Sequence, residues 1–505
     1  LMYDLRVRVF SHLQRLSLDF FTEEKAGRLL TRMTSDIEAL SNLLQTGLVN
    51  LVAQLLALFF ILILLFSFNL QLTLILLVFS APVMFGFTFW FSKTSKRGYE
   101  VVRSRISNVL ADLQESLSGM RLVISFNRMK HNVINHRNIV GDYRDANHYT
   151  SKIQATYRQG TQFITTATSL LVFTAGFFIL KNVNPSLDPE GTFTVGSLVA
   201  FNVLVARFFI PINELSGLYN EFQSGNAAVL KLRDLLDTEP SVKESENCFD
   251  LKDLKGDIRL KDVSFSYDGN ITVLKNISLH IEAGKTVSFV GPTGGGKSTI
   301  AKLMCRFYDP SEGSITLDNI NLKDISLQSL HSQLGIVPQE PFLFHGTIKD
   351  NILFARPEAT DEEVVEACKA VGIEEMIRRL PEGLETHCHE RGSSLSSGER
   401  QLLALARAFL SKPRVLILDE ATSNVDQQNE AKIEKALDRL LEGRTAIIIA
   451  HRLATTRRAD VIVVIDEQQI LEMGSHEELI QKKGRYFQMY ETWERQEEEK
   501  SEDIL

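Results

Sequence analysis

A glycine-rich stretch at residues 287–299 holds the residues best suited to bind an anion. It reads Val-Ser-Phe-Val-Gly-Pro-Thr-Gly-Gly-Gly-Lys-Ser-Thr, which has the spacing of a phosphate-binding loop. Glycines let backbone N–H groups turn inward around phosphate oxygens, and the helix expected after Thr299 points its positive end at the same anion. A glycine-rich turn with a stray lysine is the alternative, and the apolar strand before the loop strongly disfavours it.

Two residues of this loop have distinct predicted roles. Lys297 can reach the β- and γ-phosphates of ATP, and the hydroxyl of Ser298 can ligate Mg²⁺. We therefore predict ATP and Mg²⁺ as cofactors, and Lys297 as a catalytic residue. The loop residues predicted to contact the nucleotide are Gly291, Pro292, Thr293, Gly294, Gly295, Gly296, Lys297, Ser298 and Thr299.

A second candidate group lies where an apolar run ends in two acids. The run Val415-Leu416-Ile417-Leu418 is followed by Asp419 and Glu420. A buried strand that ends in this way delivers Asp419 to Mg²⁺ and Glu420, as general base, to a water molecule beside the γ-phosphate. Two acids could follow a strand by chance, but a phosphate-binding loop upstream in the same domain favours the functional interpretation.

Length, charge and cysteine usage restrict the function classes. The chain has 505 residues, too many for one compact core, so at least two domains are expected. Its net charge of -8 gives no reason to expect nucleic acid as a partner. The four cysteines lie in the second half without a Cys-x-x-Cys pair, which fits a reduced, cytosolic domain. The cluster at residues 387–390 has no second ligand pair, so we do not predict a metal site there.

The first half has the pattern of a membrane domain. No charged residue or histidine occurs in residues 39–92, which is long enough for two spans of about 20 residues each. We predict an all-α membrane domain at 1–235, a linker at 236–256, an α/β P-loop ATPase domain at 257–490 and a charged tail at 491–505. The predicted spans lie near 46–66, 70–91, 159–180 and 195–217.

Basic residues set the predicted orientation of these spans. Lysines and arginines are concentrated in 1–40 and 93–158, whereas the other two connections carry little positive charge. The positive-inside rule therefore places those two segments in the cytoplasm. An even number of spans returns the chain to the cytoplasm before the phosphate-binding loop. We predict an integral protein of the cell membrane, in contact with lipid, with a cytoplasmic ATPase domain.

Arg207 interrupts the fourth predicted span. A charge near the middle of the bilayer costs about 2.5–3.5 kcal/mol on insertion scales, so it should face a cavity or a partner. It could sense a transported solute, or it could pair with a neighbouring helix or extend toward the membrane surface. The structural role is slightly favoured, and both remain open.

Further motifs carry a family resemblance. The segment at 395–401, Leu-Ser-Ser-Gly-Glu-Arg-Gln, resembles the signature of ATP-binding cassette proteins and precedes the Asp-Glu strand as it does in that family. The match covers residues 257–490, and the membrane half resembles an exporter domain. The other matching residues are Tyr267, which resembles the aromatic that stacks on adenine, Gln339 of the Q-loop, Asp426 of the D-loop, the switch histidine His451, and Glu390-Arg391-Gly392 of the exporter segment.

The resemblance implies an exporter subunit that hydrolyses ATP and moves a hydrophobic or amphipathic solute out of the cytoplasm by alternating access. It also implies that two such half-transporters pair head to tail, so that each ATP meets the loop of one chain and the signature of the other. His451 would then be catalytic and Gln339 a further Mg²⁺ contact. The nucleotide-binding residues that it adds are Tyr267, Gln339, Ser396, Ser397, Gly398, Glu399 and Asp426.

Two departures from the family pattern leave questions open. Half-transporters of the family have six spans, whereas four are counted here, so we expect the first two spans to be missing from this chain. The signature has Ser397 and Glu399 where the family usually has glycine and glutamine. Both a homodimer and a heterodimer with a homologous partner remain open. A non-transport machine acting on DNA or ribosomes is disfavoured by the spans, and an ATP-gated pore is the remaining alternative.

Overall fold

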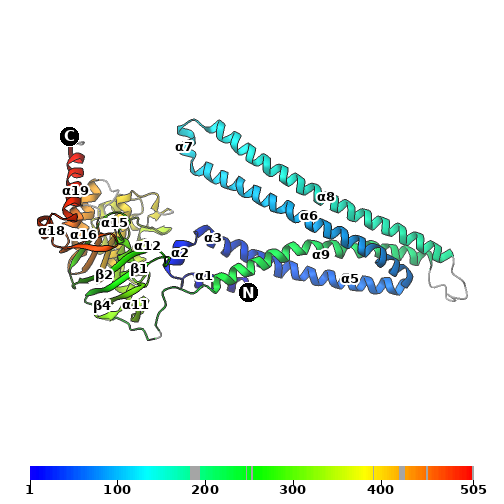
Figure 1. Ribbon diagram of the computed structural model, residues 1–505, viewed down its shortest axis with the longest axis horizontal. Helices are drawn as coiled ribbons and strands as arrows, with labels where there is room; N and C mark the ends of the chain where they lie inside the picture. The colour runs from blue at the N-terminus through cyan, green and yellow to red at the C-terminus, as the bar shows by residue number, and fades with distance from the viewer. Residues whose placement is uncertain are drawn as a thin grey trace. The chain divides into compact units, whose positions relative to one another are not determined.

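The computed structural model describes residues 1–181, 194–245, 247–251, 254–389, 392–419, 427–450 and 453–502. The chain forms two compact units (Figure 1). The first comprises Leu1–Val9 and Leu30–Asp237, and the second comprises Phe10–Leu29 and Thr238–Leu505. The first is helical and the second is an α/β unit, which confirms the predicted fold class.

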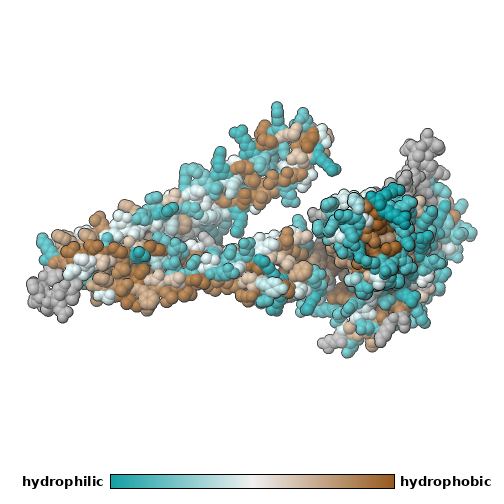
Figure 2. Space-filling model, turned by 180° about the vertical axis from the view of Figure 1, so that it is seen from behind, coloured by the Kyte–Doolittle hydropathy of each residue, from teal (hydrophilic) through white to brown (hydrophobic). Residues whose placement is uncertain are grey.

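Long helices make up the first unit. Four helices of the described residues are long and apolar enough to cross a membrane, and Figure 2 shows hydrophobic side chains along their outer surface. Two π-helical turns, η1 and η2, interrupt the segment before α5. Its elements are α1 (Met2–Leu13) as far as Val9, the last two residues of α3 (Ala26–Thr31), η1 (Arg32–Asp36), α4 (Ile37–Asn42), η2 (Leu43–Gly47), α5 (Leu48–Phe68), α6 (Leu70–Ser118), α7 (Met120–Ser125), α8 (Met129–Lys181) and α9 (Val195–Leu236).

Local sequence explains where the long helices begin. The side chain of Asn69 accepts a hydrogen bond from the backbone N–H of Leu72 at 3.0 Å and so caps the start of α6. At the start of α9, Thr194 and Ser197 form a reciprocal capping box. Such caps satisfy backbone N–H groups that have no partner inside the helix. The core of the unit is made by residues of α5, α6, α8 and α9, among them Leu65, Leu72, Leu76, Val172, Leu198 and Phe201.

The π-helical turns lie against the C-terminal half of α9. A Cβ atom on Gly225 of α9 would lie 2.4 Å from Leu43 Cδ2 in η2, so the two backbones approach closely because this residue is glycine. Lys231 of α9 forms an ion pair with the buried Asp36 of η1, with Nζ and Oδ1 3.1 Å apart. Backbone proximity and this ion pair together join the two segments.

Two main sheets organise the second unit. One is a four-stranded antiparallel sheet in the order β2-β1-β4-β5. The other has six strands in the order β12-β11-β3-β10-β9-β6 and is parallel except for β12. The strands are β1 (Ile258–Ser266), β2 (Thr272–Ile281), β3 (Thr286–Val290), β4 (Glu312–Leu317), β5 (Ile320–Asn321), β6 (Leu334–Val337), β7 (Gly346–Thr347), β8 (His387–Cys388), β9 (Val415–Asp419), β10 (Thr445–Ile449), β11 (Val461–Asp466) and β12 (Gln469–Gly474).

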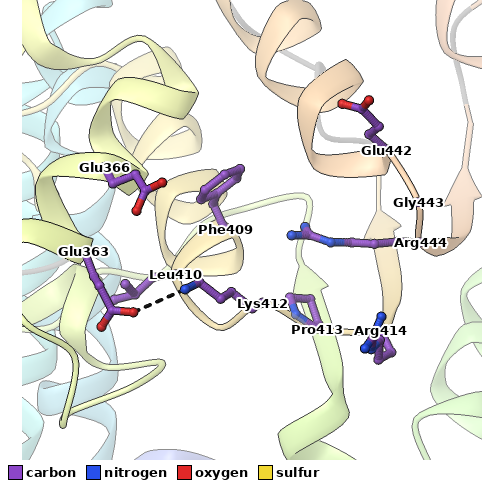
Figure 3. A pocket seen from close by; sticks show the side chains of 10 residues that line it. All are labelled: Glu363, Glu366, Phe409, Leu410, Lys412, Pro413, Arg414, Glu442, Gly443 and Arg444. Carbon is purple, nitrogen blue, oxygen red and sulfur yellow. Dashed lines mark hydrogen bonds and ion pairs between the residues drawn. The ribbon is translucent and has the colours of Figure 1, made fainter. Parts of the chain in front are cut away.

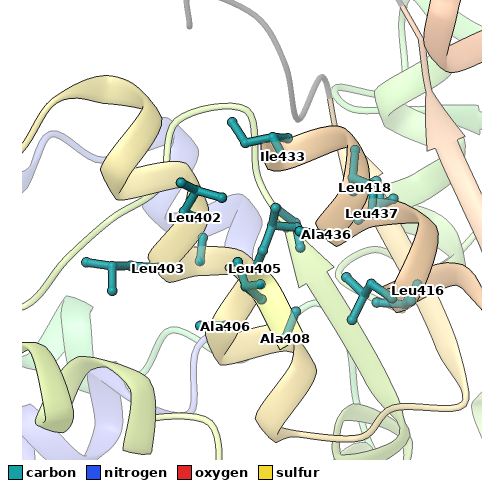
Figure 4. Close-up of a cluster of buried hydrophobic side chains, with 14 of the residues drawn as sticks. Leu402, Leu403, Leu405, Ala406, Ala408, Leu416, Leu418, Ile433, Ala436 and Leu437 are labelled. Atoms are coloured by element: carbon teal, nitrogen blue, oxygen red, sulfur yellow. The ribbon is translucent and has the colours of Figure 1, made fainter. Parts of the chain in front are cut away.

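Helices cover the six-stranded sheet and enclose an apolar core. Figure 4 shows side chains of α15, α16 and β9 meeting in this core, including Leu405, Leu437 and Leu418, each at most 2% exposed. The helices of the unit are α2 (Leu18–Glu23), α10 (Lys297–Met304), η3 (Leu322–Asp324), α11 (Leu327–Gln333), α12 (Ile348–Leu353), α13 (Asp361–Val371), α14 (Glu374–Arg379), η4 (Gly383–Glu385), α15 (Ser397–Leu410), α16 (Gln427–Leu441), α17 (Leu453–Thr456), α18 (His476–Lys482) and α19 (Arg485–Glu502).

Candidate functional site

The parallel sheet brings the main candidate residues to one edge. Gly291 directly follows β3, Gln339 lies two residues after β6, and Asp419 is the last residue of β9. Ile449 of β10 is paired with Phe289 on one side and with Asp419 on the other, so these strand ends are level. Segments distant in sequence therefore meet where the strands end, which is where open α/β sheets bind ligands.

Steric constraints require glycine at two loop positions. Gly291 has φ 149°, and a Cβ atom there would lie 2.0 Å from the carbonyl oxygen of Ile465. Gly296 has φ 100°, and a Cβ atom there would lie 2.6 Å from Leu274 Cδ2. By contrast, Gly294 has φ 84° and nothing near its missing side chain. The loop is thus fixed at both ends and open at its centre, where an anion can approach the backbone.

Lys297 lies inside the turn of this loop. It is the first residue of α10 and is only 5% exposed. Its ammonium group donates hydrogen bonds to the carbonyl oxygens of Gly291 and Pro292, both at 2.8 Å. A buried cation at a helix N-terminus, enclosed by backbone, forms a strongly electropositive centre. Ser298 is exposed beside it, so its hydroxyl is accessible to a metal ion.

Tyr267 is positioned next to this loop by neighbouring aromatic residues. Its hydroxyl lies 3.1 Å from Thr299 Oγ1, and its ring makes edge contacts with Phe265 and Tyr308. The side chain of Lys302 places its ammonium 5.8 Å from the ring centre. The tyrosine remains 44% exposed, so the ring has free surface on which a planar base can stack.

The signature segment begins helix α15. Ser396 is the N-cap residue: its hydroxyl accepts from the N–H of Glu399 at 3.2 Å, and Glu399 Oε2 accepts from the N–H of Ser396 at 2.8 Å. A Cβ atom on Gly398 would lie 2.7 Å from Asn429 Cβ, so glycine is required there too. Ser397 is exposed. The acid at position 399, which departs from the family pattern, therefore caps its own helix.

Some predicted site residues lie outside the described residues. Glu420 directly follows β9, and His451 lies two residues after the end of β10. Both therefore belong to segments that continue the chain from strands that the structure describes. The others are Asp426 of the D-loop and Glu390 and Arg391 of the exporter segment.

The residues that support the predicted ones were not identified from the sequence. Phe265 and Tyr308 hold the ring of Tyr267, and Asn429 packs against Gly398. Their contacts join segments far apart in the chain, and no local motif marks them. A further contact brings Thr22 of α2 to Tyr308, with the hydroxyl oxygens 3.4 Å apart. The short helix α2 thus contacts the same aromatic cluster.

A separate hollow lies at the opposite edge of the six-stranded sheet. It has a volume of about 430 Å³ and is lined by residues that include Lys412, Arg414 and Arg444 (Figure 3). Arg414 directly precedes β9 and Arg444 directly precedes β10, whereas the phosphate-binding loop follows the far end of β3. Burial and the nearby Arg414 lower the pKa of Arg444. None of the residues lining this hollow was predicted to bind nucleotide.

Comparison with protein families agrees with this geometry. Residues 1–212 match the family model described as ABC transporter transmembrane region. Residues 274–423 match the model described as ABC transporter. These two matches follow each other on one chain, as expected for a fused membrane and ATPase subunit.

Individual relatives cover nearly the whole chain. It is 39% identical to the uncharacterized ABC transporter ATP-binding protein YknV of Bacillus subtilis, over 96% of this chain and 79% of that protein. It is 36% identical to the fatty acid ABC transporter ATP-binding/permease protein of Mycobacterium bovis, over 97% of this chain and 76% of that protein. The solved structure of a bacterial Atm1-family ABC exporter with ATP bound has a TM-score of 0.80 and 30% identity, covering 97% and 84% of the two chains.

The spans, the fused ATPase unit and the extent of these matches lead to one assignment. The protein is an integral membrane protein whose ATPase domain lies in the cytoplasm and whose ATP hydrolysis is coupled to transport. The chain belongs to the ABC transporter family, as an exporter-type half-transporter with a transmembrane region followed by a nucleotide-binding domain.

Proposed function

We propose that this half-transporter uses ATP hydrolysis to move a hydrophobic or amphipathic solute out of the cytoplasm, paired with a second half-transporter. The observation that carries the proposal is the enclosed ammonium of Lys297 at the strand edge that also holds Asp419, on one chain with four apolar helices. The relatives described above as exporters and as a fatty acid transporter support the direction and the solute class.

The loop fits the phosphates of ATP. Its backbone is open at Gly294 and sterically fixed at Gly291 and Gly296, so N–H groups are held ready for phosphate oxygens. Lys297 neutralises their charge from inside the loop, and Tyr267 offers its exposed ring to the adenine. The donor set for Mg²⁺ is the hydroxyl of Ser298 with the oxygens of Gln339 and Asp419, the hard ligands this ion prefers. Bound there, Mg²⁺ would neutralise charge on the phosphates.

A pair of residues that follow strand ends completes the proposed chemistry. Glu420 follows Asp419 directly, and we assign it as the base that accepts a proton from the attacking water. His451 is assigned to hold the γ-phosphate by a hydrogen bond.

The signature is proposed to act on the ATP of a partner subunit. Ser396 and the backbone N–H of Gly398 lie at the N-terminus of α15, where the helix dipole favours an anion. Ser397, Glu399 and Asp426 would lie at the same boundary. Pairing of two chains would place this positive helix end opposite a partner's phosphate-binding loop, so that hydrolysis depends on both subunits. A copy of this chain and a homologous chain are both suitable partners.

The experiment compares variants of the protein reconstituted in sealed vesicles. Glu420→Gln should retain ATP binding but lose hydrolysis by about 100-fold or more, because general base catalysis contributes on that scale. Lys297→Ala should weaken ATP binding, whereas Lys261→Ala, an exposed lysine of β1 in the same unit, should not. Rapid phosphate release by the Glu420→Gln variant would refute the assignment of the base.

Transport is measured in the same vesicles. Solute uptake that requires ATP hydrolysis and stops with Glu420→Gln supports an exporter. An ATP-gated pore would instead pass ionic current when ATP is bound, and the Glu420→Gln variant would hold it open. Current of that kind without uphill solute accumulation would overturn the proposal.

A further inference from the structure

One face of helix α9 is packed into the core of the membrane unit. Leu198, Phe201, Val205 and Phe208 follow each other at intervals of three or four residues, and each is at most 4% exposed. They contribute to the apolar cluster made with α5, α6 and α8. The inward face of α9 is therefore fully occupied by protein contacts.

The opposite face of α9 carries an exposed stripe that ends in a charge. Val195, Val199 and Val203 are spaced by four residues and are 68%, 50% and 55% exposed. Arg207 is next in this series and is also exposed. Residues spaced by four lie on one side of a helix. The three valines therefore form a continuous apolar strip on the N-terminal side of Arg207.

Arg207 lies deep within the apolar span. It is the thirteenth residue of Val195–Leu215, the part of α9 that is long and apolar enough to cross a membrane. At 1.5 Å per residue its Cα atom lies about 18 Å from the start of the helix, close to the middle of a hydrocarbon core of about 30 Å. Long basic side chains reach the membrane surface from helix ends, and Arg207 is not near an end.

No described residue compensates this charge. Arg207 has neither a hydrogen bond nor an ion pair with any described side chain or backbone group. An uncompensated cation at this depth costs about 2.5–3.5 kcal/mol, which a bound anion would offset through charge-assisted hydrogen bonds to the guanidinium. The position thus has the features of a site for an anionic group.

We propose that Arg207 binds the anionic head group of a single-chain amphiphile whose hydrocarbon chain lies along Val195, Val199 and Val203. This inference rests on the proposed export function and names its solute class. The strip from Val195 to Val203 is about 12 Å long, and its start lies about 18 Å from Arg207 along the axis, comparable with the roughly 15 Å that one leaflet of acyl chains occupies. A single guanidinium group at the C-terminal end of a single apolar strip matches a long-chain carboxylate better than a compact or multiply charged solute.

Glu214 is a charged residue of the same helix that differs from Arg207 in its depth in the membrane. It lies seven residues beyond Arg207 on the same exposed face, about 10 Å further along the axis. About 28 Å from the start of the helix, it lies close to the far boundary of a hydrocarbon core of about 30 Å, where its carboxylate reaches water. It needs no bound counter-ion, so the arginine alone is assigned to the ligand.

The test measures direct binding without ATP, to the protein reconstituted in vesicles of neutral lipid. The probes share one fourteen-carbon chain, as tetradecanoate, tetradecanol, tetradecylamine and a lysophosphatidylcholine. The wild type should bind tetradecanoate most tightly. Arg207→Gln should weaken tetradecanoate binding by about tenfold or more, because hydrogen bonds to charged groups contribute on that scale. Arg207→Lys should recover part of the loss, and Glu214→Gln should leave binding unchanged or slightly tighter.

Each other result overturns the inference. Equal loss of tetradecanol binding in Arg207→Gln would show an arginine that supports structure only. Tightest binding of the amine would reverse the assigned charge, and loss of lysophosphatidylcholine binding in Glu214→Gln would indicate a zwitterionic solute held by both residues. Since binding is measured without ATP, intact tetradecanoate binding combined with failure of ATP-dependent uptake would refute only the proposed export function.

Discussion

Burial raises the pKa of three of the four cysteines, Cys305, Cys368 and Cys388, and so lowers their reactivity. Desolvation raises the pKa of Cys305 and of Cys368 to about 12, whereas Cys248 is only partly buried. Because the thiolate is the reactive form, very little of either buried thiol reacts near pH 8. We expect iodoacetamide to modify Cys248 first and Cys305 and Cys368 only after unfolding, as followed by peptide mass spectrometry. Modification of Cys305 in the native protein as fast as Cys248 would contradict this.

The capping role of Glu399 gives a second prediction at the residue scale. Glu399→Ala removes an acceptor for the N–H of Ser396 at the start of α15 and should destabilise the ATPase unit by about 1 kcal/mol. Glu399→Gln keeps an acceptor and loses only the favourable charge at the helix N-terminus, about 0.3–1 kcal/mol. Denaturant unfolding measures the free energy of unfolding of both variants and of the wild type. Identical free energies of unfolding for the wild type, Glu399→Ala and Glu399→Gln would exclude the capping role.

Loop residues and their supports differ in how far sequence predicts them. The phosphate-binding loop is recognisable because each position has a local steric or chemical reason, such as the fixed glycines at 291 and 296. The aromatic supports of Tyr267 and the contact of Asn429 with Gly398 depend on the fold of distant segments. Sequence therefore predicts which residues could carry the chemistry of the site but not which residues hold them in place.

At the scale of elements, composition predicted the apolar helices and not their irregular turns. An uncharged run is long enough to show that spans exist. The π-helical turns η1 and η2 contact α9, where Lys231 pairs with Asp36 and Gly225 lies against Leu43. Such turns are often found at functional sites. The residues of the turns do not mark these contacts, because α9 lies far later in the chain.

Gly225 tests this contact. In Gly225→Ala the new Cβ atom would lie 2.4 Å from Leu43 Cδ2 and 2.9 Å from its Cβ, so the variant should lose about 1–3 kcal/mol through overpacking, less the roughly 1 kcal/mol that alanine gains in helix propensity. Gly217, on the same helix, has nothing near its missing side chain. Gly217→Ala should therefore be neutral or stabilising. Thermal unfolding in detergent compares them, and equal melting temperatures would exclude the close contact.

At the scale of the whole molecule, the positive-inside rule gives a topology that labelling can check. Ser67, near the C-terminal end of α5, is exposed, and so is Asn127, between α7 and α8. In a Cys248→Ser background, an impermeant maleimide should label Ser67→Cys in intact cells and Asn127→Cys only after permeabilisation. The reverse pattern would invert the membrane orientation and contradict a cytoplasmic ATPase domain.

Sequence predicted the order of the two regions but not which short segments belong to each unit. Residues 10–29 group with the ATPase unit although they precede α5, α6, α8 and α9 in the chain. The cause is a set of non-local contacts, such as that of Ser17 Oγ with the N–H of Val242 at 3.0 Å. Local composition carries no trace of such contacts, so a boundary drawn from hydropathy divides the chain differently from its packing.

The central position of β3 affects how the protein is made. Its two neighbours in the sheet, β10 and β11, lie far later in the chain, at Thr445–Ile449 and Val461–Asp466. At about 5–20 residues per second, a ribosome takes roughly 10–30 s to go from β3 to β10. During that interval the apolar strand before the phosphate-binding loop has no partner, while the membrane helices have already left the ribosome. A growing chain is therefore anchored in the membrane well before it can hold a nucleotide.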